Sequence, residues 1–113
     1  FMLGWALRKM GRFEDAKQAF LEAIKFGAEK NADTLNELAL CSIQLREFSL
    51  AKKYLLDAFA LEPESTKIIS NLGYLALAEG NKQEARNYFA TVLEYDSNDK
   101  IAAAELMKLE KEE

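Results

Sequence analysis

The chain has no histidine, which removes the commonest general base and the commonest metal ligand from its 113 residues. Its one cysteine, Cys41, cannot form an intramolecular disulfide, and no basic residue close in sequence would activate it as a nucleophile. Glu14 and Asp15 are adjacent, so on a helix they splay apart instead of converging as a catalytic pair. We therefore expect no catalytic residue and no enzyme activity.

Metal and cofactor sites are also missing from the sequence. The segment DSNDKI, residues 96–101, resembles the start of a calcium loop. Lys100 stands at its fifth position, however, and Ile101 stands where a glycine should turn the chain. No glycine run that would cradle a phosphate is present. The sequence predicts neither a bound metal nor a cofactor.

Charge and hydropathy argue against two classes of partner. The formal net charge is −4, with 19 acidic and 15 basic residues spread along the chain, so no basic stripe is available to bind nucleic acid. No apolar run approaches the roughly 20 residues that a membrane-spanning helix needs. We expect no nucleic-acid binding and no membrane insertion. A single cysteine also fits a cytoplasmic location.

Proline occurs once and glycine five times, so few positions interrupt regular structure. The chain is rich in Ala, Leu, Glu and Lys, which favour helices, and its β-branched residues never form an alternating run. This composition predicts an all-α fold. The length suits one domain, residues 1–113.

What the sequence does contain is an internal repeat, in three segments that begin at Leu3, Leu38 and Leu72 and are separated by steps of 35 and 34 residues. Each segment reads as two helices around a short turn, at Gly11-Arg12, Arg46-Glu47 and Gly80-Asn81. The columns that match between the segments are Leu3-Gly4, Leu38-Ala39 and Leu72-Gly73, then Ala16, Ala51 and Ala85, then Phe20, Leu55 and Phe89, then Ala23, Ala58 and Val92.

These columns resemble the tetratricopeptide repeat, a helix-turn-helix unit of about 34 residues whose motif runs W-x2-L-G-x2-Y and then G, A, F, A and P. The resemblance implies a right-handed superhelical array of antiparallel helix pairs, an α-solenoid of about seven helices. Its expected parts are a repeat at 1–30 that is clipped at its N-terminal end, repeats at 31–65 and 66–99, and a capping helix at 100–113. Arg46 departs from the motif, because it stands where the turn glycine is expected.

The helical spacing separates an expected core from an expected groove. The core positions are Leu3, Gly4, Leu7, Leu35, Leu38, Ala39, Ser42, Ile69, Leu72, Gly73 and Ala76 on the first helices, with Phe13, Phe20, Ile24, Phe48, Leu55, Phe59, Phe89 and Leu93 on the second helices. The residue after each small one lies about 100° further round its helix. These residues are Trp5, Leu40 and Tyr74.

The resemblance implies that this second stripe lines the inner wall of the superhelix, where the family commonly holds a peptide. Apolar contacts would come from the large side chains and polar rim contacts from their neighbours. The predicted partner-binding residues are Trp5, Arg8, Lys9, Asn36, Leu40, Ile43, Gln44, Lys67, Asn71, Tyr74 and Leu77. The alternative is that neighbouring repeats cover this column and make it part of the core.

We therefore expect a non-enzymatic module or scaffold that binds a protein or peptide partner through an apolar or amphipathic segment. The family's carboxylate clamp would fall on Phe1, Trp5, Glu37, Lys67 and Asn71, where only Lys67 has the expected type. An acid at Glu37 would repel a carboxylate, so we expect no binding of chaperone tails. Two other functions stay open: self-association as a homo-oligomer, and regulation of an enzyme elsewhere in a longer parent chain.

Overall fold

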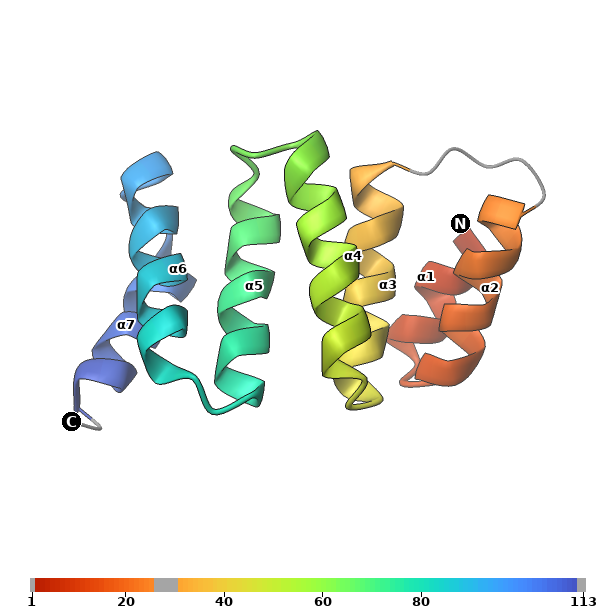
Figure 1. The fold of residues 1–113 in the computed structure, drawn as a ribbon, viewed down its shortest axis with the longest axis horizontal. Helices are drawn as coiled ribbons and strands as arrows, with labels where there is room; N and C mark the ends of the chain where they lie inside the picture. The colour runs from red at the N-terminus through yellow and green to blue at the C-terminus, as the bar shows by residue number, and fades with distance from the viewer. Residues whose placement is uncertain (1, 26–30, 112–113) are drawn as a thin grey trace. The chain divides into compact units, whose positions relative to one another are not determined.

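Seven α-helices make up the described part of the chain in a computed structural model (Figure 1). The structure describes residues 2–25 and 31–111, without the side chains of Met2, Leu3 and Trp5, and contains no strand in those ranges. The helices are α1 (Met2–Lys9), α2 (Phe13–Lys25), α3 (Ala32–Gln44), α4 (Phe48–Leu61), α5 (Thr66–Ala78), α6 (Lys82–Tyr95) and α7 (Lys100–Lys111). The prediction of an all-α fold with about seven helices is confirmed.

The helices group into two compact units, Phe1–Glu62 with α1 to α4 and Pro63–Glu113 with α5 to α7. Within the first unit, α1 packs on α2, α2 on α3 and α3 on α4. Within the second unit, α5 packs on α6 and α6 on α7. The helix pairs fall within the repeat ranges expected from the sequence. A single domain over residues 1–113 stays a prediction.

All three helix-turn-helix hairpins turn through a residue with positive φ, at the positions that the sequence predicts. Gly11 and Gly80 have φ values of 79° and 81°, and Arg46 adopts 62° at the corresponding place in the second hairpin. Glycine adopts this conformation without strain, whereas a side chain at the same position is penalised. The arginine departs from the repeat motif in sequence but not in backbone conformation. Its guanidinium lies 5.3 Å from the centre of the Phe48 ring.

Short polar side chains begin four of the helices. The side-chain oxygens of Asn31, Ser65, Asn81 and Asp99 accept hydrogen bonds from the backbone N–H three residues later. Each bond satisfies one of the donors that a helix start leaves without an internal partner. The connections between repeats therefore define where α3, α5 and α7 begin, and the Asn81 turn defines the start of α6.

Close helix approach determines the core of each hairpin. A Cβ atom added at Gly4 would lie 2.9 Å from the Phe20 ring, and one added at Gly73 would lie 2.8 Å from the Phe89 ring. Real Cβ atoms do not approach other atoms so closely, so these two glycines leave the space that the rings fill. In the second repeat, the corresponding residues are Ala39 and Leu55, both fully buried. Ala39 is larger than the glycine of the other repeats, and Leu55 is smaller than their phenylalanine, so the two differences offset each other.

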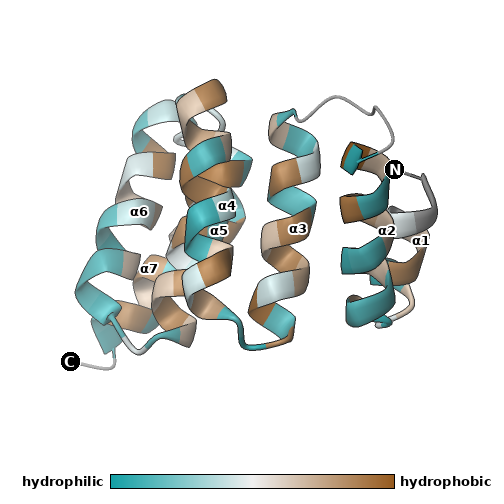
Figure 2. Cartoon of the chain, turned by 45° about the vertical axis from the view of Figure 1, so that its right-hand side comes forward, coloured by the Kyte–Doolittle hydropathy of each residue, from teal (hydrophilic) through white to brown (hydrophobic). Residues whose placement is uncertain are grey.

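Each unit has its own buried apolar cluster. In the first unit, Phe20 and Leu38 pack with Leu7, Ala16 and Cys41. In the second unit, Phe89 and Ile69 pack with residues of α6 and with Ala102 and Leu109 of α7. The face of α6 that is turned to the viewer in Figure 2 is hydrophilic to neutral, as expected for the outer side of an amphipathic helix.

Most expected core positions are buried, with one clear correction. Phe59 is 37% exposed, whereas its neighbour Ala58 is fully buried. The buried residues of α4 are Ala51, Leu55 and Ala58, and Phe59 lies one position, about 100°, beyond the last of them. The prediction of Phe59 as a core residue is therefore wrong. Phe13, Ile24, Phe48 and Leu93 are half-buried at the edge of the core, and the side chain of Leu3 lies outside the description.

Candidate functional site

Arg8, one of the predicted rim residues, is held by an ion pair within the first unit. Its Nε donates to Oε2 of Glu37, and a second guanidinium nitrogen lies 3.4 Å from Oε1. The Glu37 side chain is only 5% exposed, so the pair joins α1 to an almost buried carboxylate on α3. A planar guanidinium matches a carboxylate through such paired contacts. The charge of Glu37, which the sequence left without a partner, is thus neutralised from α1.

The other predicted residues of α3 differ in exposure. Leu40 and Ile43 are half-buried and Gln44 is exposed, as is Lys9 on α1. Asn36, however, is only 1% exposed. Because α3 packs against both α2 and α4, only a narrow strip of its surface stays open. An exposed rim position for Asn36 is therefore corrected, while Leu40 and Ile43 stay accessible at their edges.

Trp5 lies on α1, but its side chain is outside what the structure describes, and Phe1 lies outside the described residues. The predicted contact made by Trp5 therefore stays a prediction. Its backbone follows directly after Gly4, whose missing Cβ faces the Phe20 ring. The next position around the helix is turned about 100° from that contact.

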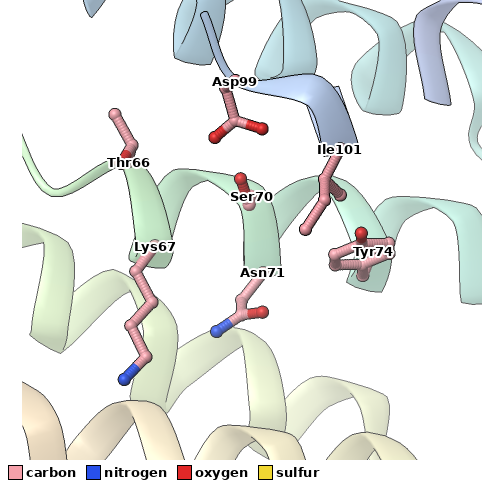
Figure 3. A pocket seen from close by; sticks show the side chains of 7 residues that line it. All are labelled: Thr66, Lys67, Ser70, Asn71, Tyr74, Asp99 and Ile101. Carbon is pink, nitrogen blue, oxygen red and sulfur yellow. The ribbon is translucent and has the colours of Figure 1, made fainter. Parts of the chain in front are cut away.

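The second unit brings three predicted residues together in one surface pocket of about 300 Å³ (Figure 3). Lys67, Asn71 and Tyr74 line it from successive turns of α5. Lys67 is exposed, and Asn71 is 8% exposed, so the amide belongs to the floor and not to an outer rim. The full lining consists of Thr66, Lys67, Ser70, Asn71, Tyr74, Asp99 and Ile101.

Tyr74 has one side in this pocket and the other against the core. Its ring contacts the Phe89 ring edge-on, with centroids 5.3 Å apart and planes inclined by 75°. Edge-to-face contacts of this kind stabilise the fold by about 0.5–1.5 kcal/mol. Leu77 is half-buried against the same cluster. Tyr74 therefore contributes to the core and also lines the pocket, while its role as a partner contact stays a prediction.

Four pocket residues were not among the predicted site residues: Thr66 and Ser70 on α5, and Asp99 and Ile101 further along the chain. Asp99, which directly precedes α7, and Ile101, in the first turn of α7, lie beside α5 and complete the pocket. The sequence carried one signal for them, because Asp99 stands where a helix cap is expected before Lys100. A cap at Asp99 puts Ile101 in the first turn of α7, and Ile101 is 61% exposed there.

Cys41 and the acidic residues offer no reactive centre in the described part of the chain. The pKa of the Cys41 thiol is raised to about 11, mainly by burial; the charge of Glu37 adds to this rise, and the charges of Arg8 and Lys17 oppose it. Such a thiol is poorly ionised at neutral pH. Among the described residues, no group of three or more His, Cys, Asp or Glu is placed to hold a metal ion. No helix in the described ranges is long and apolar enough to span a membrane.

Two sequence profiles described as tetratricopeptide repeat match the chain, one over residues 1–63 and the other over residues 43–109. The chain belongs to the tetratricopeptide repeat family. Human tetratricopeptide repeat protein 7B is 29% identical over 98 residues, which cover 87% of this chain and 12% of that protein. This tetratricopeptide repeat chain therefore spans about one eighth of the length of that relative.

Solved tetratricopeptide repeat structures share the same helical arrangement. The second TPR domain of human RPAP3, solved in complex with the HSP70 peptide SGPTIEEVD, has a TM-score of 0.82 and 26% identity. The match covers 95% of this chain and 88% of that one. The Arabidopsis OM64 TPR domain has a TM-score of 0.86 and 23% identity, over 97% of this chain and 90% of that one. At that identity, the second likeness concerns the fold alone.

Proposed function

We propose that this tetratricopeptide repeat chain is a non-enzymatic interaction module that binds a peptide segment against α5, with Tyr74 as its main apolar contact. The observation that carries the proposal is the pocket beside Tyr74, which joins an aromatic surface to the polar groups of Lys67, Ser70 and Asn71. Apolar surfaces with a few convergent polar groups are the usual form of binding sites.

The proposal is supported by the likeness to the second TPR domain of human RPAP3, a domain solved with a bound peptide. The contacts of that peptide need not carry over, because Glu37 and Asn71 occupy two of the positions that the carboxylate clamp would use. With Glu37 bound to Arg8, the position supplies neither a free donor nor a free cation. Rejection of acidic C-terminal tails therefore stays our expectation, and its reason is now the missing donor at Glu37 instead of charge repulsion.

Trp5, Leu40 and Ile43 stay predicted contact residues of the first unit, on the strength of the family resemblance. Leu40 and Ile43 are half-buried, so each leaves part of an apolar side chain for a partner. Large apolar side chains that a partner covers contribute much of the binding energy in many interfaces.

The experiment compares Tyr74→Ala with Tyr88→Ala. Both tyrosines are half-buried and pack against the same core cluster, but only Tyr74 lines the pocket. Peptides are first selected from a random dodecapeptide library with the wild-type chain, and their dissociation constants are measured by calorimetry. We expect Tyr74→Ala to weaken binding by about 2 kcal/mol or more, roughly 30-fold, as at a hot spot.

Tyr88→Ala should leave the affinity within about twofold of wild type, because it removes comparable core packing without touching the pocket. Urea unfolding of both variants checks that each is folded in buffer without urea. Their affinities are compared under those conditions. A Tyr74→Ala variant that is folded and binds as tightly as wild type would contradict the proposal.

Self-association is a second candidate function, favoured by the exposed apolar side chains on α7. Ile101 is 61% exposed and Met107 is 58% exposed. The ends of stacked repeats are surfaces that another chain can cover. Light scattering over a concentration series distinguishes the two candidates, because a peptide-binding monomer keeps its mass whereas a self-associating array grows.

A further inference from the structure

The pocket beside α5 has two sides of different charge (Figure 3). Figure 3 shows the Asp99 carboxylate and the Ser70 hydroxyl on one side, pointing toward each other, with Ile101 and Tyr74 next to them. The Lys67 side chain runs away from Asp99, so its ammonium group lies on the opposite side. The side formed by Asp99, Tyr74 and Ile101 is therefore acidic and apolar at once.

Asp99 keeps a net negative charge although it caps a helix. One carboxylate oxygen, Oδ1, accepts a hydrogen bond from the N–H of Ala102 at 2.9 Å. A helix start carries about half a positive charge, which offsets only part of the full negative charge of the carboxylate. The second carboxylate oxygen and the remaining charge stay available on the pocket side.

The charge of Asp99 also acts on the hydroxyl of Tyr74. Burial raises the pKa of its hydroxyl, and the negative charges of Glu105 and Asp99 raise it further. Glu105 is paired with Lys108 at 3.7 Å, a long contact to an exposed ammonium group that offsets its charge only in part. Two carboxylates thus act on the aromatic ring that forms the apolar wall of the pocket.

A partner side chain that fits this half of the pocket needs an apolar stem and a cationic end. The stem of lysine or arginine has three or four methylene groups, and such stems commonly lie along apolar surfaces while the charged end reaches a polar partner. Tyr74 also offers an aromatic ring, which attracts cations. An acidic or purely aliphatic side chain would satisfy one half of these contacts and not the other.

We infer that the peptide bound at this site places a lysine or arginine side chain between Tyr74 and Ile101, with its cationic end against Asp99. This inference rests on the proposed function. It names a basic peptide segment as the partner chemistry, in contrast to the acidic peptide SGPTIEEVD of the RPAP3 domain.

The test uses the peptides that the wild-type chain selects from the random dodecapeptide library. Their sequences are compared with the unselected library, and the best binder is remade with each Lys or Arg replaced by Gln. Affinities are then measured for wild type, Asp99→Asn and Asp96→Asn. Asparagine is as good a helix cap as aspartate, so Asp99→Asn removes the charge and keeps the cap.

Asp96→Asn is the matched control, because Asp96 is exposed, lies in the same connection and does not line the pocket. We expect the selected peptides to be enriched in Lys or Arg, and Asp99→Asn to weaken their binding about fivefold with no change for Asp96→Asn. Replacing the critical basic residue of the peptide by Gln should weaken its binding to the wild-type chain. The same replacement should change its binding to Asp99→Asn very little, because the charge that it would contact is already gone.

The inference is overturned if the selected peptides show no enrichment in basic residues, or if Asp99→Asn and Asp96→Asn bind them equally well. In that case the proposed function still holds as long as Tyr74→Ala loses binding. A library that yields no binder, or binders that ignore Tyr74, overturns the proposed function and the inference together.

Discussion

At the residue scale, single side chains in this chain have roles that follow from what they contact. Cys41 lies at a column of small core residues and is fully buried. Arg8 lies on a predicted groove stripe and instead neutralises Glu37. The burial of Cys41 agrees with helical spacing, because Cys41 lies three residues after Leu38 on the same side of α3. The pairing of Arg8 with Glu37 could not be inferred, because it depends on how α1 approaches α3, and α2 lies between these helices in the sequence.

Cys41 predicts a specific dependence of stability on alkaline pH. Burial raises the pKa of its thiol from 9.0 to about 11, so the folded state holds the proton more tightly than the unfolded state. The stabilisation is complete below the unfolded pKa and is lost as the pH rises through the folded one. Its full extent is about 2–3 kcal/mol.

Urea unfolding at a series of alkaline pH values checks this prediction. The free energy of unfolding should fall more steeply for wild type than for Cys41→Ala between the two pKa values. The Lys17 ammonium, whose pKa is raised by its hydrogen bond to Glu47, adds a decrease of the same sign in both proteins and so does not affect their comparison. Equal slopes for wild type and Cys41→Ala would show that burial does not control this thiol.

The Arg8–Glu37 pair predicts an asymmetry between single and double substitution. Arg8→Met leaves a nearly buried carboxylate without its cation, so we expect the free energy of unfolding to fall by about 2–4 kcal/mol. Glu37→Gln added to Arg8→Met removes that charge and should restore most of the loss. Chemical unfolding of the single and double variants measures both values. A double variant that is less stable than Arg8→Met alone would contradict this explanation.

At the element scale, the helix hairpins were predictable because local signals agree. The repeat columns and the turn positions indicate the same hairpins, and the structure confirms them. Phe59 was not predictable in the same way. Its apolar character suggested the core, yet Ala58 takes the buried position next to it, and helical spacing alone does not distinguish the centre of a buried face from its edge.

The glycines at the helix crossings lead to a prediction about paired residue size. Gly73→Ala would place a methyl group 2.8 Å from the Phe89 ring, which must then move. We expect a loss of about 1–3 kcal/mol in the free energy of unfolding. The second repeat already has Ala39 with Leu55 at these positions. Adding Phe89→Leu to Gly73→Ala should therefore recover part of the loss.

Thermal and urea unfolding of the two single variants and the double variant give the coupling between the positions. A favourable coupling supports the size match between the crossing residue and the ring that faces it. Strictly additive losses would mean that the glycine is needed for another reason.

At the scale of the whole molecule, the family and the all-α architecture could be predicted from the sequence because each repeat restates the same pattern. The candidate site could be predicted only in part. Lys67, Asn71 and Tyr74 share one face of one helix, so spacing alone groups them. Asp99 and Ile101 join them only because α7 folds back beside α5, a contact between elements that no local pattern specifies.

Partner chemistry also belongs to this scale, since it depends on which charges surround the apolar stripe. The sequence indicated an apolar or amphipathic peptide. The structure adds that Tyr74 lines its pocket together with the carboxylate of Asp99, directly before α7, and the amide of Asn71 on α5. A repeat motif describes the residues that hold the helices together and leaves such surface combinations free to vary.

The most direct test of peptide binding at the Tyr74 pocket is a nitrogen–proton correlation spectrum recorded with and without a library-selected peptide. The account predicts shifts at the backbone amides of Ser70, Tyr74 and Ile101, with the largest changes along α5 and the start of α7. Amides on the hydrophilic face of α6 should stay in place. Shifts confined to α2, α4 and α6, with none along α5, would contradict it.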